Sequence, residues 1–378
     1  MEVASMFDLA DSEWFVLFTV LVTSFAVCAA LILTTHWHGR LSLDHDTQGV
    51  QKLHDMPVPR IGGLAIAAGL IAGGVGLMVV GSKGGKTTLL LMACALPAFG
   101  AGLIEDLTKR VSVRNRLLAS FASGALAIWV LGAQLNQLHT PGLDLLMTLA
   151  PVAMLFTCFA VGGVTNSVNI IDGLNGLASG SVVIMLGGLG AIAWMAGDHK
   201  VLHVCLVGMA AVGGFMLLNY PFGKIFLGDG GAYLAGFWLA ECAVLLLARN
   251  PSVSTWGVLL VCFYPVWETA FSMYRRNVVH KVSSGVPDCK HLHHLLLQKI
   301  ISRKLGPHQP AWVKHGLASP LSWMLVLGCQ GVAVANYQDT VWLVAGVVCF
   351  VLTYQMIYRS VQRETGIGQA LQGTPETR

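Results

Sequence analysis

The sequence predicts an all-α protein that crosses a membrane about eleven times. Of its 378 residues, 55% are hydrophobic and only 11% are charged, and the mean hydropathy is +0.67. Soluble domains carry about 25% charged residues, so the composition excludes an ordinary soluble globular protein. A helix of about 20 apolar residues spans the roughly 30 Å hydrocarbon core of a bilayer, and segments of that length recur along the chain.

Eleven apolar segments have a length that fits a membrane span. They lie at 14–34, 61–81, 88–104, 117–133, 143–163, 178–196, 201–218, 230–247, 254–274, 318–335 and 341–358. A short polar break at 198–200 separates the sixth from the seventh, and Tyr264-Pro265 predicts a kink in the ninth. The acidic amino terminus lacks the basic segment of a cleavable signal. We therefore expect one transmembrane domain over residues 1–358 and a polar cytoplasmic tail over 359–378.

The basic residues predict how the chain is oriented. When the amino terminus is placed outside and eleven spans are counted, 19 of the 23 lysines and arginines fall on the inner side. The positive-inside rule then predicts a cytoplasmic carboxyl terminus. This orientation also places carboxylates, amides and histidines from several loops on the cytoplasmic face. We therefore expect a composite site there, with a substrate that comes from the cytoplasm.

The most informative of these loops runs from Asn166 to Leu177, between two apolar segments. Polar groups buried in a membrane without partners cost several kcal/mol each, so this loop is expected to line a wet site. If the chain is helical here, Asn166, Asn169 and Asp172 lie broadly on one face. Amides can read a nucleobase or a sugar, and a carboxylate with an amide oxygen suits Mg²⁺ bound to substrate phosphates.

The loop before segment 230–247 supplies a second candidate oxygen ligand. This residue is Asp229, which is followed by two glycines. Phe226, three residues earlier, could stack on a nucleobase or pack into the core, and its position favours neither role.

Two further inner loops combine acidic and basic residues. Glu105 and Asp106, with Lys109 one helical turn later, could take a proton from a phosphate monoester or help to position a cation. A solvated helix end is the alternative. In the first inner loop, Lys52 and Arg60 could hold phosphates or anchor the chain to anionic lipid.

The longest polar stretch follows the ninth span and contains His291, His293 and His294. Beside Lys290, these histidines suit phosphate oxygens. A zinc site could be drawn from the histidines and Cys289, but the spacing matches no common zinc pattern.

Two acids lie inside predicted spans, Glu241 and Glu268, and both are functional candidates because ionisable groups are costly in a membrane. Residues 81–87 look like a phosphate-binding loop. That loop is one residue short, however, and is predicted to lie outside, away from ATP.

Five ordered motifs resemble those of a known family along nearly the whole chain. They are Pro59-Arg60-Ile61-Gly62-Gly63, the acidic pair 105–106 with Lys109, the run from Asn166 to Leu177, the run from Asn219 to Asp229, and His291-Leu292-His293-His294. The chain resembles the polyprenyl-phosphate N-acetylhexosamine-1-phosphate transferases, a membrane family that includes the MurNAc-pentapeptide translocase of peptidoglycan synthesis. The resemblance implies a fold of ten or eleven helices, a cytoplasmic active site, Mg²⁺ dependence and frequent homodimers.

The resemblance also implies roles for individual residues. Mg²⁺ at the pyrophosphate would be held by Asp229 and Asn169. Uridine would be contacted by Phe226 and Asn175, with Asn219 nearby. The sugar-phosphate would be met by Asp172, His291, His293 and His294, and a phosphate by Lys109. The first acid of the pair is the family's proposed base for the lipid phosphate. Here it is Glu105, where an aspartate is common, so the base could be Glu105 or Asp106.

Two departures favour one branch of the family. Asn175 stands where the MurNAc-pentapeptide enzymes usually carry aspartate, and a leucine interrupts the three histidines. Both features resemble the simpler N-acetylhexosamine enzymes that start O-antigen or enterobacterial common antigen.

The expected function is transfer of N-acetylhexosamine-1-phosphate, with GlcNAc most favoured, from a UDP-sugar to undecaprenyl phosphate. UMP would be released, and the product would start a lipid-linked cell-surface polysaccharide such as that of lipopolysaccharide. The cofactor would be Mg²⁺, with Mn²⁺ as a substitute, and the partners would be membrane lipids and a second copy of the chain rather than nucleic acid. We expect the protein in the bacterial inner membrane. The alternative is a membrane transporter of a sugar phosphate or nucleotide sugar, although no internal repeat is evident.

Overall fold

The computed structural model describes residues 9–43, 57–279, 281, 288, 290–306 and 308–372. In these ranges the chain is helical and forms no sheet; the one antiparallel bridge joins Leu43 to Pro59. The predicted all-α fold class is therefore confirmed.

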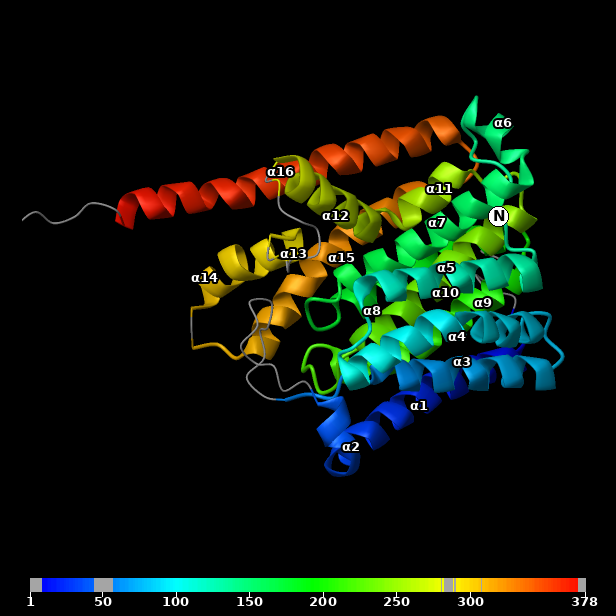
Figure 1. Ribbon diagram of the computed structural model, residues 1–378, viewed down its shortest axis with the longest axis horizontal. Coiled ribbons are helices and arrows are strands. Elements are labelled where there is room, and N and C mark those ends of the chain that lie inside the picture. The colour runs from blue at the N-terminus through cyan, green and yellow to red at the C-terminus, as the bar shows by residue number, and fades with distance from the viewer. Residues whose placement is uncertain are drawn as a thin grey trace, which may run out of the picture.

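The helices follow the order shown in Figure 1. They are α1 (Asp11–Leu33), α2 (Thr35–Ser42), α3 (Gly62–Val79), α4 (Gly85–Thr108), α5 (Val113–Leu131), α6 (Leu143–Met147), α7 (Ala150–Ile170), α8 (Leu177–Met195), α9 (His199–Asn219), α10 (Gly228–Arg249), α11 (Thr255–Val261), α12 (Phe263–Tyr274), the π-helix η1 (Arg275–Val279), α13 (Leu292–Leu295), the π-helix η2 (Leu296–Ile301), α14 (Ser302–Leu305), α15 (Ala311–Ala335) and α16 (Thr340–Gln372).

Nine helices in the described ranges are long and apolar enough to cross a membrane, and the bent pair that begins with α11 and α12 would make a tenth span. The nine are α1, α3, α4, α7, α8, α9, α10, α15 and α16. The remaining predicted span, 117–133, corresponds to α5. Its first turns contain Arg114 and Arg116, and it is not among the nine helices that are apolar enough to cross a membrane. The chain is a multi-pass membrane protein, and α5 begins with a polar first turn.

Two predicted boundaries differ from the structure. The predicted span 143–163 is divided into α6 and α7, with Thr148 and Leu149 between them. The Asp144 carboxylate, within α6, accepts hydrogen bonds from the backbone N–H groups of Leu138 and Thr140, at 2.5 and 3.0 Å, and holds the turn that precedes α6. The long helix α7 begins only at Ala150, with a proline in its first turn. At the other end of the chain, α16 continues past Tyr358 as far as Gln372.

The kink predicted at Pro265 is present, and the break lies three residues earlier. The helix axis bends by 78° between α11 and the segment that starts with α12. Proline has no N–H to donate to the carbonyl one turn before it, which is that of Val261. The side-chain amide of Gln330, on α15, donates to this carbonyl at 3.0 Å, so the broken turn keeps its hydrogen bond.

Helix α10 forms the centre of the bundle and packs against α3, α4, α7, α8 and α9. Nearly all of its residues from Gly230 to Leu246 are buried. Small residues permit this close packing: a Cβ atom added to Gly63 would lie only 2.7 Å from the Cα atom of Gly231. The first turns of α3 and α10 therefore lie backbone against backbone.

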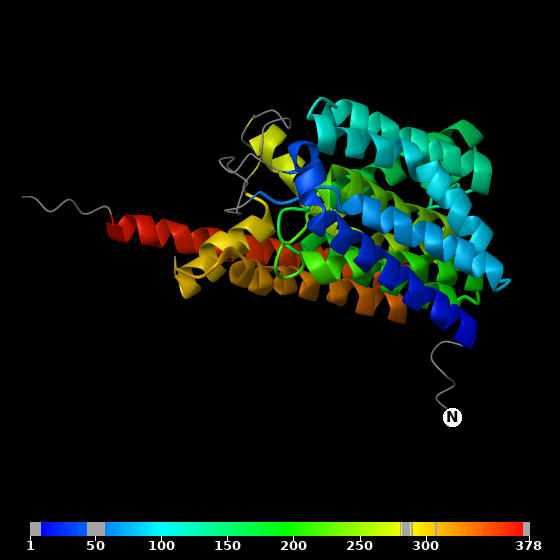
Figure 2. The ribbon, with the colours of Figure 1, turned by 90° about the horizontal axis from the view of Figure 1, so that it is seen from below.

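The two ends of the bundle differ in character (Figures 1 and 2). Most helices run side by side along the long axis. Helices α2, α13 and α14 and the loop before α10 lie at one end, and the start of α1 and the short helix α6 lie at the other. The loops that carry the sequence motifs therefore gather at a single end.

Candidate active site

Asp106, near the end of α4, holds the first turn of α10. Its Oδ1 atom accepts a hydrogen bond from the backbone N–H of Asp229 at 2.9 Å, and its Oδ2 atom accepts one from Gly230 at 2.8 Å. A helix start leaves such N–H groups without partners inside the helix, and a carboxylate there is favourable. Gly228 makes the approach possible: its φ is +71°, and a Cβ atom would lie 2.6 Å from Asp106 Oδ2.

Asp229 lies between cations from two other elements. Its carboxylate forms an ion pair with Arg116 of α5, and its Oδ1 atom lies 3.7 Å from Arg60 Nη2. The same Arg60 nitrogen lies 3.7 Å from Asp106. Asn169, in the last turn of α7, donates to Asp229 Oδ1 at 3.1 Å. Four separate segments therefore meet at one carboxylate.

Sequence reasoning did not single out Arg116. A signal was available, since an arginine stands in the first turns of an otherwise apolar helix whose N-cap, Ser112, accepts from the N–H of Asn115 at 3.2 Å. The Arg116 side chain is only 12% exposed, and its guanidinium lies 5.9 Å from the centre of the Tyr233 ring. A buried cation of this kind needs an anion, and here the anion is Asp229.

The sequence spacing predicted that Asn166, Asn169 and Asp172 lie on one helix face. The two asparagines do lie on one face of α7, whereas Asp172 lies beyond its end. Asn166 accepts a hydrogen bond from the Tyr233 hydroxyl at 3.2 Å, so it faces α10 as Asn169 does. The helix ends at Ile170, and Asp172 lies in the following turn, where its N–H donates to the carbonyl of Asn169 at 3.2 Å.

Asp172 has an unusual protonation equilibrium. The surrounding protein withholds water from its carboxyl group, which raises the pKa to about 7; nearby Arg60 opposes the rise and Asp106 adds to it. Near neutral pH this group therefore exists in both forms. Perturbed pKa values of this kind are common at functional sites.

The three histidines form one buried cluster against the loop after α7. The ring centroids of His293 and His294 are 4.3 Å apart, and those of His291 and His293 are 5.5 Å apart in a stacked arrangement. A Cβ atom on Gly173 would lie 2.8 Å from His293 Nε2 and 3.0 Å from His294 Nε2. Glycine at 173, beside Asp172, is what lets both imidazoles approach this loop.

The rings of His293 and His294 have hydrogen-bonding capacity that the described part of the protein does not use. All four of their ring nitrogens are buried and have no hydrogen-bond partner in the described part of the chain. Burial lowers the pKa of His294 to about 4, with a further contribution from His291, and lowers that of His293 well below its usual value. Both imidazoles are therefore neutral at pH 7, each with one N–H donor and one acceptor nitrogen.

This burial predicts a pH effect on stability. Below pH 6.5 His294 takes up a proton in the unfolded chain but not in the folded one until the pH nears 4, so the folded state loses stability as the pH falls. The raised pKa of Asp172 has the opposite effect on folding stability over an overlapping pH range. The contribution of His294 is therefore isolated by comparing wild type with His294→Gln. We expect their difference in unfolding free energy to change by about 2 kcal/mol between pH 7 and pH 5. Denaturation in detergent would measure it, and an unchanged difference would contradict the burial argument.

Asn175 and Asn219 hold two loops together. Asn219 Oδ1 accepts from the N–H of Gly176 at 2.7 Å, and its amide nitrogen donates to the carbonyl of Ile225 at 2.8 Å. Asn175 donates to the carbonyl of Pro221 at 2.9 Å. Both side chains are buried, so these amides shape the site by joining the loop after α7 to the loop before α10. Their contact with a nucleotide stays a prediction.

The other predicted residues lie around this centre or outside the described ranges. Phe226 is half-buried, and its backbone N–H donates to the carbonyl of Pro59 at 2.8 Å. This hydrogen bond joins the loop before α10 to the segment before α3. Glu105 is half-buried, and its Oε2 atom accepts from the N–H of Val111 at 2.7 Å. Lys109 is exposed at the end of α4 in a left-handed conformation. Lys52 lies outside the described residues.

The two acids predicted within spans have different surroundings. Glu268, on α12, belongs to the polar network around the histidines. Glu241 is fully buried in the middle of α10, and no described residue forms a hydrogen bond with its carboxyl group. The zinc interpretation gains no support, because no group of three or more His, Cys, Asp or Glu side chains in the described ranges could hold a metal, and Cys289 lies outside them.

The residues around Asp229 fit a hard divalent cation. A carboxylate and an amide lie side by side, at 3.1 Å, and oxygen donors of these two kinds are what Mg²⁺ takes from proteins, with substrate phosphates and water filling the other positions. The positive charge beside Asp229 is supplied here by Arg116 and Arg60.

These features define a class of protein, namely a multi-pass membrane protein with a charged polar centre at one end of its helical bundle. Residues 88–247 match the model of glycosyl transferase family 4. The chain is 30% identical over 265 residues to the Bacillus subtilis (strain 168) protein named "Probable undecaprenyl-phosphate N-acetylglucosaminyl 1-phosphate transferase", an alignment that covers 69% of this chain and 72% of that one.

Two further relatives show the breadth of the similarity. The Yersinia pestis undecaprenyl-phosphate alpha-N-acetylglucosaminyl 1-phosphate transferase is 26% identical over 83% of this chain and 84% of its own. The phospho-N-acetylmuramoyl-pentapeptide-transferase of Geobacillus thermodenitrificans (strain NG80-2) is 31% identical over 54% of this chain and 65% of its own. The chain belongs to this family of polyprenyl-phosphate phosphosugar transferases. The family resemblance drawn from the five motifs is confirmed, and the transporter alternative finds no support among these relatives.

Proposed function

We propose that this protein transfers GlcNAc-1-phosphate from UDP-GlcNAc to undecaprenyl phosphate. An oxygen of the lipid phosphate attacks the β-phosphorus of the UDP-sugar, the bond to the α-phosphate breaks, and UMP leaves. The product is undecaprenyl-pyrophosphoryl-GlcNAc, which would start a lipid-linked surface polysaccharide. The names of two relatives support the substrates. The observation that carries the proposal is the meeting of Asp229, Asn169 and two arginines beside the neutral rings of His293 and His294.

The chain must bring two anions together, so its positive groups are central to the mechanism. Arg60 and Arg116 are the cations at Asp229, and both carry a fixed positive charge suited to phosphate oxygens. The first N–H groups of α10 are already bonded to Asp106, so the helix terminus shapes the site rather than binding phosphate directly. Phosphoryl transfer depends mainly on such positioning and charge neutralisation.

We further propose that Asp229 and Asn169 hold Mg²⁺. When bound, Mg²⁺ would supply positive charge for the substrate phosphates, with Asp229 and Asn169 as the residues that would hold it. The neutral rings of His293 and His294 would donate hydrogen bonds to phosphate oxygens of the sugar-phosphate. The nearby carboxyl group of Asp172, with a pKa of about 7, could accept or donate a hydrogen bond to the same group.

Between the two candidate bases, the geometry favours Glu105. Both oxygens of Asp106 are committed to backbone N–H groups of α10. Glu105 uses Oε2 for Val111, and among the described residues no donor reaches its Oε1 atom. We propose that Glu105 accepts the proton of the lipid phosphate when that phosphate is monoprotonated, while Asp106 holds α10 in place.

The direct experiment is a transfer assay on purified protein in detergent or vesicles. With UDP-GlcNAc, undecaprenyl phosphate and Mg²⁺, we expect equal amounts of UMP and lipid-linked GlcNAc. EDTA should abolish both, Mg²⁺ should restore them, and Mn²⁺ should restore them in part. Activity that persists at full rate after EDTA and removal of bound metal would contradict the metal proposal. UMP release without undecaprenyl phosphate would contradict the proposed acceptor.

We propose that this end of the bundle faces the cytoplasm of the bacterial inner membrane, because 19 of the 23 basic residues fall on that side in the predicted topology. Thiol labelling would test the side. A Lys109→Cys variant should react with a membrane-impermeant reagent only after the cells are opened, whereas Lys83→Cys, in the loop between α3 and α4, should react in intact cells. The reverse pattern would refute the orientation. The homodimer stays a prediction.

A further inference from the structure

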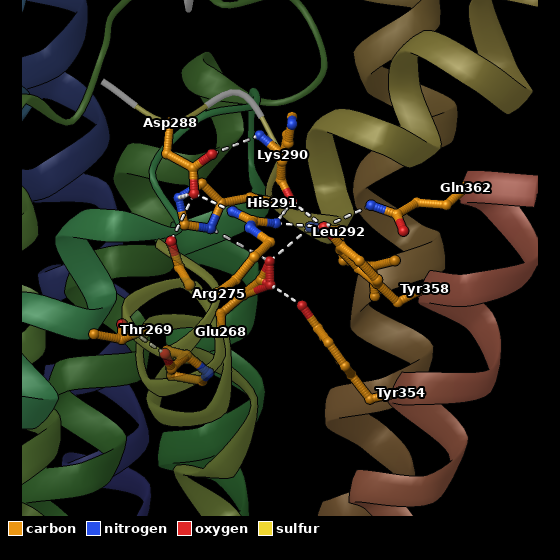
Figure 3. A network of polar contacts seen from close by, with 12 residues as sticks. Glu268, Thr269, Arg275, Asp288, Lys290, His291, Leu292, Tyr354, Tyr358 and Gln362 are labelled. Atoms are coloured by element: carbon orange, nitrogen blue, oxygen red, sulfur yellow. Dashed lines mark hydrogen bonds and ion pairs between the residues drawn. The ribbon is translucent and has the colours of Figure 1, made fainter. Parts of the chain in front are cut away.

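A polar network outside the Asp229 centre joins α12, residues 290–294 and α16 (Figure 3). Residues 290–294, which include the three histidines, are called the histidine segment below. Glu268 lies at its middle and is only 1% exposed. Its Oε1 atom accepts a hydrogen bond from the backbone N–H of Leu292 at 2.7 Å, and its Oε2 atom accepts one from the Tyr354 hydroxyl at 2.6 Å. One buried carboxylate thus links three segments that are far apart in the sequence.

The contact with Leu292 matters because this residue begins α13. His291, the N-cap residue, makes no side-chain cap hydrogen bond, so the helix start lacks the partner that Ser, Thr, Asp or Asn would provide. Glu268 provides an acceptor from another helix, and a negative charge at a helix start is also favourable. Since α13 contains His293 and His294 and runs directly into η2, fixing its first N–H fixes the direction in which both imidazoles point.

The three histidines divide into two kinds. His291 lies between two carboxylates, with its Nδ1 atom 3.5 Å from Glu268 Oε1 and its Nε2 atom 3.6 Å from Asp288 Oδ2. The rings of His293 and His294 face Gly173 instead. All four of their nitrogens are buried without a hydrogen-bond partner in the described part of the chain, as is Nδ1 of His291. His291 is distinguished by its two nearby carboxylates, which make it part of the support, while the other two rings face the loop that contains Asp172.

A second group of contacts holds the other side of the same segment. Asp288 accepts from the Ser272 hydroxyl at 2.6 Å and pairs with Arg275, and Arg275 also donates to the carbonyl of Lys290 and to the Tyr358 hydroxyl. Helix α16 thus meets the histidine segment twice, one helical turn apart, through two tyrosines. Tyr354 acts through Glu268, and Tyr358 acts through Arg275 and Lys290.

We propose that Glu268 is a positioning residue for the histidines, and that Tyr354 holds Glu268 in turn. Its carboxylate fixes the start of α13, so that His293 and His294 are held against the loop containing Asp172 before any substrate arrives. The catalytic consequence rests on the proposed phosphosugar transfer. The structural part, protection of the start of α13 by Glu268, does not.

The substitution Glu268→Gln separates hydrogen bonding from charge. The glutamine carbonyl oxygen still accepts from Leu292 N–H, and its amide nitrogen can donate to the Tyr354 hydroxyl, which then acts as acceptor. Glu268→Ala removes both bonds. Thr269→Val is the matched control on the same helix, because within the described ranges the Thr269 hydroxyl donates to the carbonyl of Pro265 in α12, at 3.0 Å, and to no other group.

Two measurements test the proposal. In hydrogen exchange without substrate, Glu268→Ala should increase deuterium uptake of residues 291–297, while Glu268→Gln and Thr269→Val should match wild type. In the transfer assay, Glu268→Ala should lower kcat about 100-fold and change KM for UDP-GlcNAc less than about 3-fold, because a displacement of about 1 Å costs on that order. Glu268→Gln should restore kcat to within about 5-fold of wild type.

Several outcomes would overturn the proposal. They are unchanged exchange in Glu268→Ala, a kcat per folded molecule equal to wild type, or equal losses in Glu268→Ala and Glu268→Gln. If Glu268→Ala does not fold, Tyr354→Phe removes a single hydroxyl and should lower kcat between about 3-fold and 10-fold; a value equal to Thr269→Val would refute the role of α16. Absence of transferase activity in the wild type would instead refute the proposed function, and the exchange result would still decide the structural part.

Discussion

Replacement of Asp229 by alanine is expected to lower phosphosugar transfer by at least about 1,000-fold, or about 4 kcal/mol of transition-state stabilisation. The substitution removes the proposed metal ligand and leaves the guanidinium of Arg116 without its ion-pair partner. The fold should persist, because Asp106 bonds to the backbone N–H of residue 229 rather than to its side chain. The assay would follow lipid-linked GlcNAc and UMP on protein whose folding is confirmed by its elution volume in detergent.

Asp198 offers a matched control at the opposite end of the bundle. It also pairs with an arginine from α10, since Arg249 Nε lies 2.6 Å from its Oδ2 atom, and it accepts from Val201 N–H at 3.2 Å as the cap of α9. Asp198→Ala should therefore lower the unfolding temperature and leave turnover per folded molecule near that of wild type. Near-normal turnover in Asp229→Ala would rule out the metal role of Asp229.

Asp106→Ala is expected to lower both stability and transfer, whereas Glu105→Ala is expected to lower mainly transfer. Asp106→Ala removes two charge-assisted hydrogen bonds at the start of α10, each worth about 1.5 to 3 kcal/mol, so both stability and transfer should fall. Glu105→Ala removes a half-buried carboxylate with one backbone partner, so stability should change by less than about 1 kcal/mol. Its transfer rate should nevertheless fall about 100-fold, as expected for loss of a general base.

The two variants would be compared by thermal unfolding and by initial transfer rates on the same preparations. Full activity in Glu105→Ala would contradict its role as the base. An unfolding temperature in Asp106→Ala equal to that of wild type would contradict the structural role that its two hydrogen bonds assign to it.

Much of the fold could be predicted because the physical signal is strong. A membrane requires long apolar helices, so the segments that became α1, α3, α8, α9 and α10 stand out in the sequence. The differences lie at element boundaries, where local structure competes with hydropathy. The predicted span 143–163 is divided into α6 and α7, and α16 continues beyond the predicted end of its span.

The candidate site could be predicted in part, for a related reason. Asp106, Asn169 and Asp229 stand out because polar residues at the ends of apolar helices need an explanation, and the structure brings these three together. Their detailed partners depend on which helices become neighbours, which one sequence does not specify. Arg116 was missed because its place in the first turns of an apolar helix does not by itself show that it pairs with Asp229.

The roles of two amides illustrate the same limit. Asn175 and Asn219 look like ligand-reading groups in the sequence, since each lies in a polar loop beside a predicted span. In the structure their side chains bond to backbone groups of the neighbouring loop. Buried amides satisfy whichever donors and acceptors the fold brings near, and this depends on the packing of loops that are distant in the sequence.

The most direct test of the account uses UDP-GlcNAc labelled with ³²P at the β-phosphorus and ¹⁴C in the sugar. Purified protein, undecaprenyl phosphate and Mg²⁺ should give a lipid product that contains both labels in the ratio of the donor, with unlabelled UMP released. A lipid that carries ¹⁴C without ³²P, or both labels remaining in the water-soluble donor, would contradict phosphosugar transfer by this site.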